Sequence, residues 1–147
     1  MMLDDFLALE NILVTRLQDG IPELAACGSY LTLTTLQHTA LVFPSVWVGY
    51  GGYQMEGDPL AQGTVQQIRQ IWHVSVLVRV GTDPGSGSDV RAAAGPLITK
   101  VLKLLMGWKP GDRMRPLELI AAPDPEYGDG VGMFHLSFAC SIPLSNR

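Results

Sequence analysis

Charged residues are scarce in this 147-residue chain: Asp, Glu, Lys and Arg make up 16% of it, where soluble domains average about 25%. Fourteen acidic residues against ten Lys and Arg give a net charge of −4, and the basic residues form no evident cluster. This balance argues against specific nucleic-acid binding. Because 47% of the residues are hydrophobic, the composition is that of a folded domain, and its low charge predicts that a partner covers part of its surface.

Long apolar runs and an export signal are also missing. No run approaches the ~20 apolar residues of a membrane helix, so we expect no membrane partner. The first residues end in Asp4 and Asp5, where a secretory signal would be basic, which favours the cytoplasm. The two cysteines, Cys27 and Cys140, lie far apart and outside metal-type spacing. Cys140 is expected in the core, while one disulfide stays open as an alternative.

No motif for chemistry stands out. The loop 85–87 has the place of a dinucleotide-binding loop, but a valine follows where the third glycine is needed. In the acidic loop that starts at Asp124, the twelfth position is a histidine and not the glutamate of a calcium loop. Three histidines lack an acidic or cysteine partner at ligand spacing: His38, His73 and His135. We therefore predict no catalytic residue, no cofactor, no metal and no enzyme activity, although a triad assembled only by folding would escape this reasoning.

Two helices are predicted. Residues Leu3 to Gln18 repeat apolar side chains every three or four positions, with Asp4 and Asp5 as N-cap candidates and a glycine after the end. A second helix is expected from Asp89 to about Met106, and Pro96 should kink it or break it early.

Four segments have the composition of strands: Val46–Tyr50, Thr64–Val80, Pro116–Ala122 and Gly132–Pro143. Gly51 and Gly52 should break the first, and 123–130 should form a hairpin loop. The last strand alternates so that one face is expected in the core and the other in water. Segment 21–43 is left undecided between strand, helical turn and loop.

The strand over Thr64–Val80 is the most informative element. Its apolar side chains alternate with polar ones at period two, which indicates one buried face. Fully extended it would reach about 55 Å, at ~3.3 Å per residue, whereas a domain of this size has a radius near ~15 Å. Its polar first half should therefore project. The projecting half of this strand, together with the glycine-rich segment 51–53 on the other side of the turn, predicts a β-hairpin arm over roughly residues 47–70.

Aromatic side chains gather around the predicted arm. Trp47 and Trp72 are expected in the core of the sheet. Tyr50 and Tyr53, which lie beside glycines, are the candidate oligomer-interface residues, because tyrosine buries much area and keeps a polar tip.

The order helix, strands, helix, strands predicts a single α+β domain over residues 1–147. Short connections between strands favour a mixed, largely antiparallel sheet, with two main helices packed on one face and the β-hairpin arm projecting.

This order resembles the tail terminator (tail-completion) proteins of long-tailed bacteriophages, including the Mu-like group. The resemblance is carried by the segment Phe43–Tyr50 (FPSVWVGY), the strand Trp72–Val78 (WHVSVLV) and the helix segment Arg91–Leu97 (RAAAGPL), which follow an N-terminal helix in this order.

The resemblance implies a structural virion protein at the head-proximal end of the tail, assembled in the host cytoplasm. It would cap the tail tube, end tube polymerisation and provide the surface for head-side joining. Its partners would be copies of itself in a ring, usually of six, the tail tube protein and a head-side connector or neck protein. DNA would pass the lumen without specific binding, which suits an acidic ring of about −24 charges for six copies.

Two other functions stay open. One is another head–tail connector or neck protein of similar build. The other is a small-ligand-binding or enzymatic α+β domain, which would need a deep pocket with convergent polar groups. His73, Arg79 and His135 are the residues to watch for that function.

Overall fold

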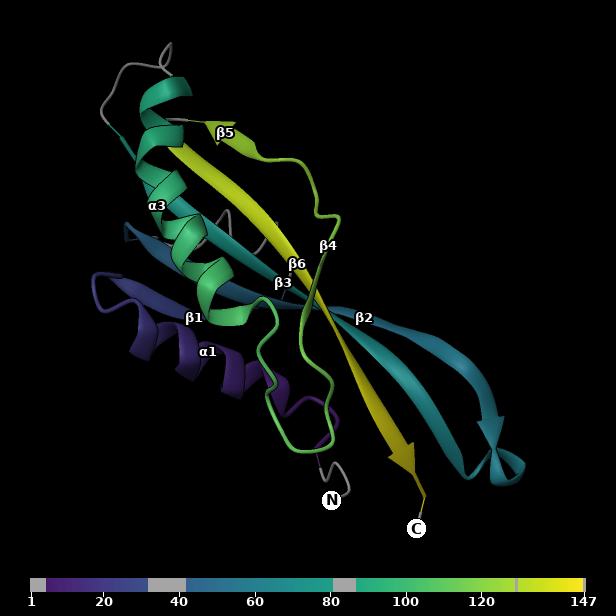
Figure 1. Cartoon of the computed structure of the whole chain (residues 1–147). Helices are drawn as coiled ribbons and strands as arrows, with labels where there is room; N and C mark the ends of the chain where they lie inside the picture. Colours follow the sequence, from purple (N-terminus) through teal and green to yellow (C-terminus); the bar gives the residue numbers. More distant parts are fainter. Residues whose placement is uncertain (1–4, 32–41, 81–86, 129, 147) are drawn as a thin grey trace.

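The computed structural model describes residues 5–31, 42–80, 87–128 and 130–146 (Figure 1). Their helical elements are α1 (Leu9–Gly20), the 3-10 turn η1 (Ala61–Gly63) and α3 (Gly87–Leu105). Their strands are β1 (Ala26–Tyr30), β2 (Ser45–Leu60), β3 (Val65–Arg79), β4 (Glu118–Ile120), β5 (Glu126–Gly128) and β6 (Val131–Ser145).

The strands form one six-stranded sheet in the order β1-β2-β3-β6-β4, with β5 paired to the start of β6. The pair β1–β2 is parallel, and the pairs that involve β3, β4, β5 and β6 are antiparallel. The predicted α+β class with a mixed, largely antiparallel sheet is confirmed.

Both helices cover the same face of the sheet (Figure 1). Leu9, Leu13 and Leu17 of α1 are buried against it, as the period of the helix predicts. From β3, the alternate side chains Trp72, Val74, Val76 and Val78 enter the same core, which confirms the faces assigned to this strand. Cys140 is also buried there, as predicted.

The helix boundaries differ from the predicted ones. The helix α1 begins at Leu9 and not at Leu3, and its N-cap residue Ala8 makes no side-chain cap. Asp5 instead accepts a hydrogen bond from the Leu7 N–H at 2.9 Å, which stabilises a turn before the helix. The helix α3 continues through Pro96. Gly95 precedes this proline and has no Cβ to clash with the ring, which lets the helix pass.

The strand β2 does not end at the glycines, as was predicted, but continues to Leu60. A register shift between Tyr50 and Tyr53 accommodates one extra residue as a bulge, and Gly52 there has a φ of 89° that glycine adopts without strain. The undecided segment contains β1, while its residues 32–41 lie outside the described part. Likewise β4 has only three residues, and β5 lies inside the predicted hairpin loop.

A substitution at Gly132 tests how α3 packs on β6. A Cβ at this position would collide with Cγ1 of Val90 and come within 2.9 Å of Cε2 of Phe134. We expect Gly132→Ala to lower the free energy of unfolding by about 1–3 kcal/mol, because it overpacks a buried contact. Urea denaturation monitored by circular dichroism measures the change.

Gly128→Ala is the matched control. Nothing lies within 4 Å of its added Cβ, so its effect should stay within about 0.5 kcal/mol. Equal effects of the two substitutions would contradict the packing described here.

Candidate functional site

The sheet projects beyond the two helices as an arm (Figure 1). The predicted β2–β3 hairpin is present, and β6 joins it as a third strand, because its pairing with β3 runs from Val65↔Ser145 to Arg79↔Val131. The arm, as the term is used below, comprises residues 50–71 of β2, η1 and β3 together with residues 139–145 of β6. The projecting part is the N-terminal half of β3, as expected.

The outer edge of β2 is open along the arm. The strand β1 pairs only with residues Ser45 to Gly49 of β2. From Tyr50 to Leu60, this edge has no further strand partner among the described residues. An edge of this kind presents backbone N–H and C=O groups to another chain.

Apolar side chains are exposed on the arm. Tyr53, Met55 and Leu60 are 56%, 62% and 64% exposed. Tyr53 contacts Phe6 edge to face, with ring centroids 5.7 Å apart, and Tyr50, which is 36% exposed, packs on Trp72 at 5.0 Å. Both tyrosines therefore lie on the helix-bearing side of the sheet.

We call Phe6, Tyr50, Tyr53 and Met55 the arm patch. An aromatic patch of this kind is typical of a protein contact. The role of Tyr50 and Tyr53 as interface residues stays a prediction. Sequence reasoning missed Phe6 and Met55, although a methionine in a polar, glycine-rich segment was a usable signal.

Buried hydrogen bonds hold the base of the arm. Gln70 is fully buried; its Nε2 donates to the carbonyl of Phe6 at 2.6 Å, and its Oε1 accepts from Nε1 of Trp72 at 3.1 Å. Gln70 belongs to the polar first half of the strand that was predicted to project, yet it is buried, because both ends of its amide find partners. On the other side of the arm, Ser141 donates to Glu56 at 2.7 Å. The arm is thus fixed before any partner arrives, which lowers the entropic cost of binding.

The helix-free face of the sheet was predicted to be wet, and at its centre this is wrong. Ser75 and Ser137 are fully buried, and His135 is 8% exposed. Nδ1 of His135 hydrogen-bonds Oγ of Ser75 at 2.8 Å, and its Nε2 lies 3.0 Å from Glu126. Nδ1 of His73 hydrogen-bonds Ser137 at 2.7 Å. These bonds satisfy polar groups that the fold removes from water.

This network contains serine, histidine and glutamate in the order of a hydrolase triad. A nucleophile must reach its substrate, however, and Oγ of Ser75 belongs to a residue with no exposed surface. The network therefore acts as a structural support for the centre of the sheet. His73 and His135 belong to it, Arg79 stacks over Phe43 at 4.9 Å, and His38 lies outside the described residues.

The two cysteines are the remaining candidate groups. Cys27 and Cys140 are free thiols, which removes the disulfide alternative. Burial raises the pKa of Cys27 to about 11 and that of Cys140 to about 12, so neither is a reactive thiolate at neutral pH. In the described ranges, no three His, Cys, Asp or Glu side chains are placed to hold a metal ion, and no helix is long and apolar enough to cross a membrane.

A stiff arm with an open edge and exposed aromatic side chains is typical of a subunit that contacts other proteins. The chain belongs to the phage tail terminator protein family, whose family model matches residues 2–147. It is therefore a structural protein of phage tail assembly. No curated protein matches the chain in sequence.

His73 should make stability depend on pH. Its burial, and to a smaller extent the charge of His135, lower the pKa of His73 below its unfolded value of ~6.5. As the pH falls through this value, the unfolded chain binds a proton before the folded chain does, so the folded state loses stability. We expect the urea midpoint to fall between about pH 7 and pH 5, and His73→Gln to make this fall shallower. Parallel profiles of the two proteins would contradict the burial of this imidazole.

Proposed function

We propose that this protein forms a closed ring on the head-proximal end of the tail tube, ends tube polymerisation and offers the surface to which the head is joined. Membership of the tail terminator family supports the site of action. The single observation that carries the ring is the arm, which projects beyond the helix-covered part of the sheet (Figure 1) and on which Tyr53 and Met55 are exposed.

The arm favours a head-to-tail contact between copies. Its exposed surface combines an open edge from Tyr50 to Leu60 with the arm patch, and the tip of the arm projects away from both helices (Figure 1). A contact between this surface and a different surface of the next copy is heterologous, and such contacts close into a ring when the rotation between copies permits. Six copies is the expected number, with the tube protein and a head-side connector on the two faces of the ring.

Charge suits passage of DNA through such a ring. Each copy carries a net charge of −4, so the assembled ring is acidic. Phosphates are bound chiefly by Lys and Arg, and an acidic wall lets the duplex pass without being held.

Loss of the protein should leave the tail tube uncapped. In cells infected with a phage whose gene for this protein carries an early stop codon, we expect tubes of excess and irregular length without attached heads, because an uncapped end keeps accepting subunits. Negative-stain electron microscopy gives the length distribution, and a plasmid copy of the intact gene is the control. Tails of normal length joined to heads would contradict the proposed function.

The arm patch should control oligomerisation. The double substitution Tyr53→Lys and Met55→Lys places charge on two side chains that are more than half exposed, so the monomer should keep its fold. We expect the dissociation constant of the ring to rise about tenfold or more relative to the parent chain, as it does when an interface anchor is lost. Native mass spectrometry measures the oligomer.

Leu31→Lys is the matched control for this test, because Leu31 is 88% exposed at the end of β1, outside the arm. It should leave the oligomer unchanged. An arm-patch variant that assembles like the parent chain would contradict the role of the arm.

A further inference from the structure

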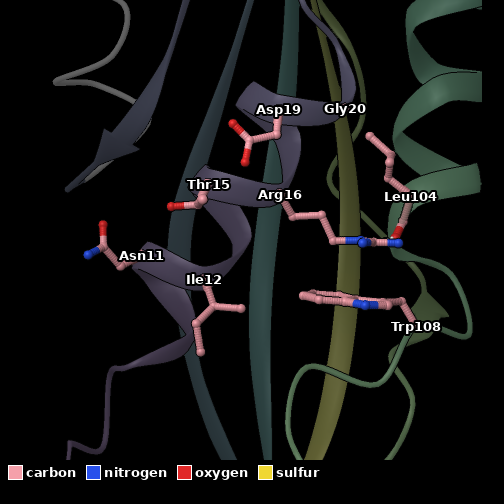
Figure 2. A pocket seen from close by; sticks show the side chains of 8 residues that line it. All are labelled: Asn11, Ile12, Thr15, Arg16, Asp19, Gly20, Leu104 and Trp108. Atoms are coloured by element: carbon pink, nitrogen blue, oxygen red, sulfur yellow. Dashed lines mark hydrogen bonds between the residues drawn. The ribbon is translucent and has the colours of Figure 1, made fainter.

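A concave surface lies between α1 and the C-terminal end of α3 (Figure 2). Its volume is about 570 Å³. Ile12, Leu104 and Trp108 give it an apolar floor, and Arg16 crosses between the two helices. Asn11, Thr15 and Asp19 of α1 form its outer wall. We call this surface the helix groove.

The helix groove is held in shape by Arg16. Its Nε donates to the carbonyl of Leu104 at 2.7 Å, which satisfies a backbone acceptor in the last turn of α3. Its guanidinium lies 4.2 Å from the centroid of the Trp108 ring. The backbone of Trp108 is fixed in turn, since its backbone N–H donates to the carbonyl of Leu105 at 3.1 Å and its carbonyl accepts from the backbone N–H of Leu117 at 2.9 Å. The cation of Arg16 has no acidic partner within the described part of the chain.

Basic residues gather in the chain around Trp108, contrary to the expectation that they form no cluster. Lys103 precedes it, and Lys109, Arg113 and Arg115 follow; all four side chains are exposed, against the single acid Asp112. They are four of the ten Lys and Arg residues of a chain whose net charge is negative. The helix groove is thus an apolar surface beside a positively charged segment.

The arm has the complementary properties. From Gly51 to Ile68 it has no Lys, Arg or His, and its tip contains Glu56 and Asp58. Met55 and Leu60 flank these acids and are 62% and 64% exposed. The arm of one copy points away from its own α1 and α3 (Figure 1), so it is placed to reach the groove of another copy.

We propose that the arm tip of one copy, residues 55–60, docks in the helix groove of a second copy. Met55 and Leu60 cover the apolar floor of Ile12 and Trp108, while Asp58 faces the basic segment 103–115. Apolar burial holds the contact, and the opposite charges fix its register and steer the encounter. The inference rests on the proposed function and names the two surfaces that join copies in the ring.

Cross-linking tests which residues meet. In the variant Lys109→Cys with Asp58→Cys, both added thiols are on exposed positions, and a short bismaleimide should link them into a ladder of covalent oligomers up to the full ring. Cys27 and Cys140, whose thiols have raised pKa values, should react little. The control places the partner thiol at Arg91→Cys, an exposed position near the other end of α3, and should give no ladder.

Charge reversal tests the register in the same assembly. We expect Asp58→Lys to weaken the ring about tenfold, Lys109→Glu with Arg113→Glu to weaken it similarly, and the combination of all three to restore it, because opposite charges face each other again. Arg91→Glu is the control for a lost basic charge outside the groove. Native mass spectrometry and circular dichroism separate assembly from folding.

The outcomes separate this inference from the proposed function. If the parent chain forms a ring and the arm-patch variant breaks it, but no ladder forms and the charge reversals do not compensate, the arm docks elsewhere and the inference is overturned while the ring stands. If the parent chain forms no ring on its own or on tail tubes, both are overturned.

Discussion

The antiparallel pairing of β3 with β6 is the interaction on which the rest of the structure depends. It is unbroken from Val65↔Ser145 to Arg79↔Val131, so the two strands enter the arm with the same register that they have beneath the helices. An isolated two-stranded ribbon is only marginally stable in water, whereas a third strand with an apolar side supports itself. The arm is therefore a continuation of the core sheet, and its exposed side chains are displayed on a stiff support.

The two faces of the sheet bury different kinds of side chain. The helix-bearing face buries apolar side chains around Trp72, and the opposite face buries a hydrogen-bonded set around Ser75 and His135. Because the side chains at the centre of both faces are buried, the apolar side chains that stay exposed lie further out, on the arm patch and in the helix groove. A charge content of 16% fits the proposed function, in which much of the outer surface contacts other subunits.

Local patterns in the sequence predicted much of the fold. Period two over 64–80 gave the strand and its buried face, and the apolar spacing of Leu9, Leu13 and Leu17 gave the first helix. The projection of the arm followed because the extended strand is longer than the radius of a compact domain of this size. The sequence failed where one residue's environment depends on a distant segment. Gln70 is buried because Phe6 offers it a carbonyl, and the glycines of β2 stay in a strand because β3 pairs across their bulge.

By itself, the sequence determined both main helices, the cores of the long strands, which of their faces carry apolar side chains, and the family resemblance, because these depend on neighbours within a few residues. The tertiary structure alone decided the third strand of the arm, the buried polar face and the helix groove. Arg16 and Trp108 show the physical reason: they stack at 4.2 Å although they are far apart in the chain. A contact of this kind exists only after the sheet has brought α1 and α3 together, and no local pattern records it.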